Sequence, residues 1–252
     1  MLFKQHYIHN NKFLLYSGVA YIGAILILLT IVKMANDSDP YNIDIFTNFL
    51  IFFVAVFGIL YSGHSFPDFR GKGSTINYLM VPSSVLEKFL FEFFSRLSIV
   101  IFLLPILFWI TYNFQGYFFN LLTDQKFQAV GFKQLLDFKL LRQIKEQGFW
   151  FFTLISSLII LVFVLPFVGG TMFFKQPLVK TLFAVTLIVI SYAGFLYFLL
   201  EPLGVGLYEP NDTTWLIPHN KEGGMRFFGS FTVIANLVFL FVAYRKLKEK
   251  EI

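Results

Sequence analysis

Long stretches without a charged residue constrain this chain more than any other feature. A bilayer core about 30 Å thick is crossed by roughly 20 apolar residues of helix, and the sequence holds five plain stretches of about this length and a weaker sixth around 45–62. The composition agrees, because 57% of the residues are hydrophobic and only 14% are charged. We therefore predict an all-α polytopic integral membrane protein, in which residues 1–252 form a single transmembrane domain. The six predicted spans are 13–32, 45–62, 90–112, 149–171, 181–200 and 227–244.

The first apolar run has a competing interpretation as a secretory signal peptide. It is longer than the apolar region of a signal peptide, about 7–15 residues, and no small-residue cleavage site follows it before the polar residues 33–40. We therefore expect a membrane span. Residues 1–12 place Phe3 and Tyr7 four apart among Lys and His, a pattern that indicates either an interfacial helix or a frayed terminus.

The distribution of Lys and Arg predicts which side of the membrane each loop faces, because positive residues stay on the cytoplasmic side. With six spans, both termini share one side with the loops 63–88 and 175–180. These segments carry 11 basic and four acidic residues, whereas the opposite side carries eight basic and ten acidic residues. We therefore expect cytoplasmic N- and C-termini, with 115–147 and 201–226 as outer loops.

The loop 115–147 carries five of the eight basic residues on the outer side and so opposes this assignment. Its segment 132–147 has helical periodicity and resembles a helix lying on a membrane surface. The apolar residues on that face are Phe132, Leu135, Leu136, Leu140 and Ile144.

Between the second and third spans, residues 63–88 read as an ordered cytoplasmic loop. Pro67, Gly71 and Gly73 exclude a long helix. Ser84 and Glu87 then match a capping box, in which each side chain accepts a hydrogen bond from the other residue's amide. A helix is therefore predicted to begin in water and to run into the third span. The loop is either a docking surface for a cytoplasmic partner or a simple connection.

Glu92 and Arg96 follow four residues apart, with the acid first, the favourable order for a helical ion pair. Both lie near the predicted cytoplasmic boundary of the third span. One interpretation is a pair of side chains that reach toward water. The other is a role in a polar pathway or in coupling the loop to the span.

Several chemistries have no support in the sequence. No G-x-x-x-x-G-K-[ST] motif occurs, and residues 69–75 (FRGKGST) lack its spacing, so this chain is not expected to hydrolyse ATP. There is no cysteine, the four histidines are scattered, and apart from Glu92 the spans carry no acid or histidine. We predict neither an enzyme nor a metal site. The polar residues that could line a pathway or pack between helices are Ser156, Ser157, Ser191, Tyr192, Tyr197, Thr232 and Asn236.

The six spans and the loop sequence FPDFRGKGSTINYLMVPSSVLEKFL together resemble the membrane subunits of type-2 ABC transporters. The likeness is to a bacterial group whose loop reads F-x-D…Y-L-x-x-P-A-S-x-L-E-K-F, with Ser83 standing where Ala is usual. The loop motif covers about 25 residues, and the arrangement of the spans covers the whole chain. The matching residues are Phe66, Asp68, Tyr78, Leu79, Pro82, Ser84, Leu86, Glu87, Lys88 and Phe89.

This resemblance implies the permease subunit of an ATP-driven exporter in the bacterial cytoplasmic (inner) membrane. Two permeases, as identical copies or paralogues, would form the path, and a separate ABC ATPase chain would bind ATP and magnesium. This chain would bind no cofactor and no nucleic acid. The alternative is a non-transporting scaffold or anchor of a larger envelope complex. The residues expected to dock the ATPase are Phe66, Asp68, Phe69, Arg70, Lys72, Tyr78, Pro82, Ser84, Glu87 and Lys88, with Glu92 and Arg96 as the coupling ion pair.

Overall fold

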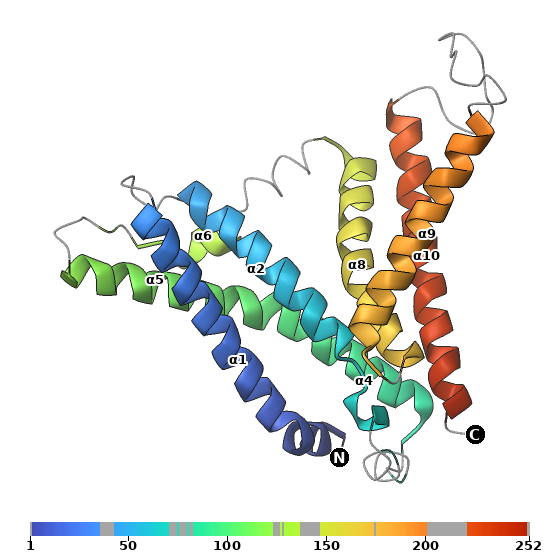
Figure 1. Cartoon of the computed structure of the whole chain (residues 1–252), viewed down its shortest axis with the longest axis horizontal. Coiled ribbons are helices and arrows are strands. Elements are labelled where there is room, and N and C mark those ends of the chain that lie inside the picture. Colours follow the sequence, from blue (N-terminus) through green and yellow to red (C-terminus); the bar gives the residue numbers. More distant parts are fainter. Residues whose placement is uncertain are drawn as a thin grey trace. The chain divides into compact units, whose positions relative to one another are not determined.

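The computed structural model describes residues 2–35, 43–70, 75, 80, 83–122, 127, 129–136, 147–173, 175–200 and 221–250. Every regular element in these ranges is a helix, which confirms the predicted all-helical class. Figure 1 shows the elements α1 (Leu2–Ala35), α2 (Ile43–Gly63), the 3-10 helix η1 (Pro67–Arg70), α4 (Val85–Ser98), the π-helix η2 (Ile99–Leu103), α5 (Leu104–Leu122), α6 (Phe132–Leu136), α8 (Phe149–Met172), α9 (Pro177–Leu200) and α10 (Lys221–Lys250).

Five helical segments in these described ranges are long and apolar enough to cross a membrane. They are Leu14–Met34, Ile45–Gly63, Val85–Leu122, Phe149–Met172 and Glu222–Lys250. Helices suit a bilayer because they satisfy their backbone hydrogen bonds internally. The predicted sixth span, 181–200, lies within α9, whose apolar part in the described residues, Pro177–Ser191, is shorter than the other five.

The chain folds into two compact units. Unit 1 comprises Met1–Tyr61 and Ile76–Arg142, and unit 2 comprises Ser62–Thr75 and Gln143–Ile252. The single transmembrane domain expected over 1–252 is therefore built from two units. The loop between α2 and α4 is shared, since its first part belongs to unit 2 and its second part to unit 1.

In unit 1, the helices α1, α2 and α5 bury large side chains at helical spacing. Tyr21, Ile25 and Leu29 of α1 are buried four residues apart, and their spacing places them on one helical face. The ring centres of Tyr21 and Phe57 of α2 are 4.8 Å apart, and those of Phe46 of α2 and Tyr112 of α5 are 4.9 Å apart. Such edge-to-face contacts between aromatic rings add to the stabilisation that comes from packing.

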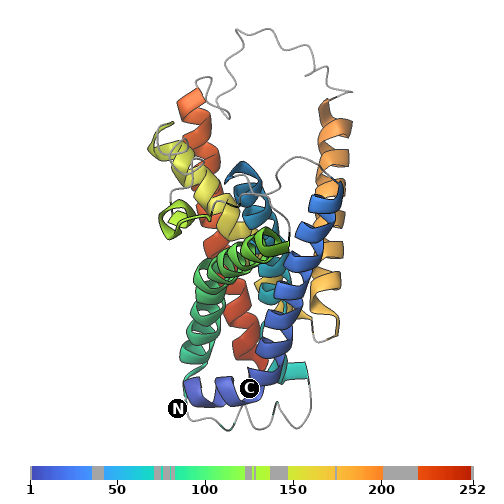
Figure 2. The same ribbon diagram turned by 90° about the vertical axis from the view of Figure 1, so that its left-hand side faces the viewer.

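The first turns of α1 run at an angle to the rest of this helix, as Figures 1 and 2 show. Residues 2–12 are helical, which favours the interfacial-helix interpretation of the N-terminus over a frayed end. The helix then continues without interruption into the apolar segment Leu14–Met34.

Helix α5 extends beyond the predicted third span, which was expected to end at 112. It continues to Leu122, so residues 115–122, predicted within an outer loop, are helical. The reason lies in contacts with α1, because Gln115 Nε2 donates to Leu26 O at 3.0 Å and to Thr30 Oγ1 at 2.8 Å. The buried amide of Gln115 binds α1 and so stabilises this part of α5 as a helix, although the segment contains fewer apolar residues than the first half of the span.

The segment after α5 folds back along that helix. Trp109 Nε1 donates to Val130 O at 2.7 Å, and Val130 N donates to Asn113 Oδ1 at 2.9 Å. Phe132 then packs edge-on against Trp109, and Leu135 is buried. Of the predicted amphipathic segment 132–147, residues 132–136 form the short helix α6, and residues 137–146 lie outside the described residues.

In unit 2, α8 and α10 run alongside each other in the same direction, joined through α9 (Figure 1). Arg226 lies over the Trp150 ring at their first turns, and Lys250 donates to Thr171 O at their last turns. Helix α10 begins at Lys221, so residues 221–226 of the predicted outer loop 201–226 are helical. Residues 201–220 of that loop lie outside the described residues.

Candidate functional site

The first part of the loop after α2 is fastened to α8. Ser62 Oγ donates to Phe163 O at 2.6 Å, and Ser65 Oγ donates to Phe167 O at 2.8 Å. These carbonyls flank Pro166, which has no N–H and disturbs the hydrogen-bond ladder of its helix. Two serine hydroxyls therefore bind backbone oxygens beside the interruption in α8.

Phe66 and Phe69 are buried within unit 2 and are only 3% and 6% exposed. The centre of the Phe66 ring lies 6.2 Å from that of the Phe69 ring and 5.6 Å from that of the Phe167 ring. Phe66 also has φ 50°, a left-handed conformation that is rare for a bulky residue and persists only where the surroundings hold it. Both aromatic residues, predicted to dock a partner, are buried and anchor the loop within unit 2.

Small residues make this close packing feasible. A Cβ at Gly170 would clash with Ser65 Oγ, and a Cβ at Gly169 would clash with Thr181 of α9. Gly63, in the last turn of α2, faces Leu178 in the same way. Small residues at helix contacts are common in membranes because they let backbones approach closely.

The C-terminal end of α10 reaches the same part of unit 2. Lys250 donates to Thr171 O, in the last turn of α8, and its ammonium lies 5.5 Å from the centre of the Phe69 ring. A cation is favourable there because the last carbonyls of a helix lack partners and carry partial negative charge. Lys250 of the basic tail, which was expected only to face the cytoplasm, therefore also contacts Phe69 of the loop.

The second part of the loop, in unit 1, ends in the predicted capping box. Glu87 N donates to Ser84 Oγ at 3.2 Å, and Ser84 N donates to Glu87 Oε2 at 3.1 Å. Helix α4 begins directly afterwards, at Val85, within the predicted loop 63–88. Lys88, expected to contact a partner, is only 2% exposed. It therefore belongs to the interior of the chain.

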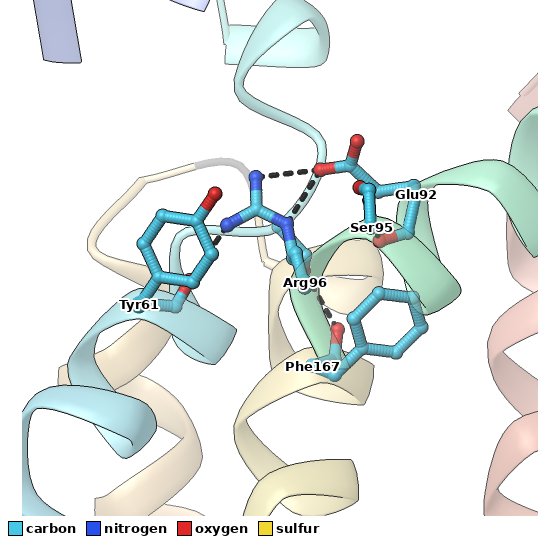
Figure 3. Close-up of polar contacts among 6 residues, drawn as sticks. Tyr61, Glu92, Ser95, Arg96 and Phe167 are labelled. Carbon is cyan, nitrogen blue, oxygen red and sulfur yellow. Dashed lines mark hydrogen bonds and ion pairs between the residues drawn. The ribbon is translucent and has the colours of Figure 1, made fainter. Parts of the chain in front are cut away.

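Glu92 and Arg96 form an ion pair that is buried, with side chains 5% and 4% exposed. Arg96 Nε donates to Glu92 Oε1 at 2.6 Å, and a terminal nitrogen donates to Tyr61 O at 2.6 Å (Figure 3). The guanidinium also lies 4.9 Å from the centre of the Tyr61 ring. Because Tyr61 O is in the last turn of α2, Arg96 caps that helix and ties it to α4. The interpretation as side chains that reach water is wrong.

The exposed part of the described loop is small. Met80 is 77% exposed, Leu86 is 49% exposed, and Ser84 and Glu87 are also exposed. Of the other predicted docking residues, Lys72, Tyr78 and Pro82 lie outside the described residues, as do the side chains of Asp68 and Arg70.

A second polar cluster lies within unit 2, between α8 and α10. Ser157 Oγ and Thr232 Oγ1 are 2.5 Å apart, and Asn236 Nδ2 donates to Ser157 O at 2.9 Å. Three of the polar residues considered for a pathway therefore hold two helices together, while Ser191 is exposed. The side chains of Tyr192 and Tyr197 lie outside the described residues.

Among the described residues, no group of three or more acidic, histidine or cysteine side chains could hold a metal ion. Comparisons with protein-family models, with curated proteins and with solved structures found no match to this chain.

Proposed function

We propose that this chain is the permease subunit of an ATP-driven exporter of the bacterial inner membrane. It would cross the membrane six times, with both termini in the cytoplasm, and pair with a second permease. A separate ATPase would dock on the loop between α2 and α4 and would carry the ATP and magnesium.

The observation that carries this proposal is the division of the loop between the two units. Residues 62–69 are anchored in unit 2 through Phe66, Phe69 and two serine hydrogen bonds. Residues 76–88 lead in unit 1 to the capped start of α4, which Arg96 ties to α2. A force applied to the loop would therefore act on both units at once, which a coupling element requires.

The arrangement within each unit supports the proposed orientation. In unit 2, the loop residues 62–69 lie at the end that also holds the last turns of α8 and α10 and the first turn of α9. In unit 1, Leu14 of α1 lies at the end near Leu60 and Ile99, whereas Thr30 lies near Gln115 at the opposite end. The basic N-terminus, loop and C-terminal tail thus lie at the loop end of their own unit, as cytoplasmic segments should, whereas the five basic residues of 115–147 oppose this orientation.

The burial of Phe66 and Phe69 changes which residues should meet the ATPase. Leu86 and Glu87 are exposed in the first turn of α4, and Met80 is exposed in the loop before it, so the three residues combine two apolar side chains with one charge. Interfaces commonly bury apolar side chains at the centre and keep charges at the rim. We therefore include these three residues in the proposed docking surface.

The test is purification of the tagged protein in mild detergent, followed by mass spectrometry of the co-purifying chains and an ATPase assay. The perturbing variant is Leu86→Asp. The matched control is Leu121→Asp, an exposed leucine at the other end of unit 1. We expect an ATPase chain at a one-to-one ratio with the wild type and with the control, and its loss from Leu86→Asp.

Two results would count against the proposal. Envelope proteins without any ATPase would favour the scaffold alternative. An ATPase that stays bound to Leu86→Asp as tightly as to the control would show that the docking surface lies elsewhere.

A further inference from the structure

An apolar groove in unit 1 lies between α1, α2 and the π-helical turn η2. Its volume is about 200 Å³. Gly18 of α1 forms part of one wall, Leu60 and Tyr61 of α2 form another, and Ile99 and Leu103 of η2 form the third. An apolar cavity of about 150 Å³ is already large enough to bind benzene, so this groove can hold several methylene groups.

The groove has no polar group that needs a ligand. Ser17 lines it, but the Ser17 hydroxyl donates to Leu14 O at 3.0 Å within α1. Leu60 and Leu103 are each 47% exposed, whereas Leu104 is buried. The groove therefore has a buried floor, and the exposed apolar residues at its edges belong to two membrane-spanning helices. A hydrocarbon chain that enters from the bilayer can therefore leave its polar head group outside the groove.

The π-helical wall is a second and independent observation. Leu104 N–H bonds to Ile99 O, the five-residue spacing of a π-helix, and Tyr21 donates its hydroxyl to Leu104 O at 3.0 Å. Single π-helical turns are rare and frequently occur at functional sites. Here the turn supplies Ile99 and Leu103 to the groove, so the unusual backbone and the groove coincide.

We propose that this groove binds one acyl chain of a membrane lipid. The occupant must be apolar, because the lining offers it no free hydrogen-bonding group. It must also be abundant in the bilayer core, because the exposed edge residues, Leu60 and Leu103, lie on apolar helices. Lipid tails meet both conditions. The site does not depend on the proposed exporter function, because an anchoring scaffold with the same unit 1 would bind the chain equally.

Two glycines of α1 provide a matched pair of variants. A Cβ at Gly18 or at Gly23 would meet no atom within 4 Å, so both positions accept a larger side chain without a clash. Only Gly18 lines the groove. Replacing glycine with leucine favours the helix to a similar extent at both positions. Gly18→Leu therefore fills the groove, and Gly23→Leu controls for the effects of the substitution itself.

The experiment uses delipidated full-length protein in detergent with one molar equivalent of phosphatidylcholine that carries a photoactivatable diazirine in its acyl chain. Native mass spectrometry counts the retained lipids, and peptide mapping locates the crosslinks. We expect one retained lipid and crosslinks in 57–61 and 99–107 for the wild type and Gly23→Leu. Displacing about two methylene groups should weaken binding roughly tenfold in Gly18→Leu.

Equal crosslinking of the two leucine variants would overturn the proposal. Crosslinks spread evenly over exposed apolar faces, such as Phe183 and Ile190 of α9, would also overturn it, because they indicate only the lipids that surround any membrane protein. Should Gly18→Leu fail to fold, Leu60→Trp narrows the groove from α2 and must give the same loss of crosslinking.

Discussion

Removing Arg96 should destabilise the protein more than removing any exposed basic residue. Arg96→Met removes this ion pair from the buried Glu92 carboxylate, and it also removes the donor to Tyr61 O in the last turn of α2. Breaking a buried ion pair by deleting one partner costs about 3–5 kcal/mol. At about 2 °C per kcal/mol for a chain of this size, the Tm should fall by about 6 °C or more.

The double variant Glu92→Met with Arg96→Met separates the two effects. It removes the buried Glu92 charge as well, and apolar replacement of both partners of a buried pair is often neutral. The remaining loss is the charged hydrogen bond to Tyr61 O, worth about 1.5–3 kcal/mol. We therefore expect the double variant to be more stable than Arg96→Met alone, although one more residue has been changed.

The assay is thermal unfolding of the purified protein in one detergent, with Lys246→Met as the control. Lys246 and Glu249 form an ion pair at 2.7 Å, but their side chains are 49% and 58% exposed. Such surface pairs contribute about 0–1 kcal/mol. The reasoning would be refuted if Arg96→Met lowered the Tm no more than Lys246→Met, or if the double variant were the less stable of the two.

Three further predictions concern local contacts, and each is measured by thermal unfolding or by amide hydrogen exchange. Gly170→Ala should destabilise by about 1–3 kcal/mol, because its Cβ meets Ser65, whereas Gly194→Ala, with open space around it, should be neutral or slightly stabilising; equal effects would contradict the packing. Ser84→Ala should cost about 0.5–2 kcal/mol and speed exchange in the first turn of α4, while Ser84→Asp should restore protection. Asn236→Leu should change stability by less than about 1 kcal/mol, because the lost hydrogen bond to Ser157 O is offset by removal of a buried acceptor without a partner; a large loss of stability would contradict this balance.

Local signals predicted some elements closely because each depends on neighbouring residues. The capping box of Ser84 and Glu87 involves side chains three residues apart, and the structure forms both of its hydrogen bonds. The second and fourth spans were predicted within two residues of Ile45–Gly63 and Phe149–Met172. Hydropathy identifies such segments because bilayer thickness sets their length.

Contacts distant in sequence decided which site residues are accessible. Phe69, Lys88 and Glu87 all read as candidates for docking, yet only Glu87 is exposed. The Phe69 ring contacts Phe66, and the Phe66 ring in turn contacts Phe167, about 100 residues further along the chain. Lys250, which lies over the Phe69 ring, is about 180 residues away from it. No periodicity within the loop itself contains that information.

The sequence by itself determined that this is an all-helical membrane protein, and it determined where α4 begins. Both follow from local physics, namely the cost of exposing polar backbone to lipid and the need to cap a helix. The tertiary structure decided that α5 continues to Leu122, that Arg96 caps α2, and that the loop is divided between two units. These features depend on hydrogen bonds between segments that are remote along the chain, such as those of Gln115 with α1, and a packed fold is needed to bring such partners together.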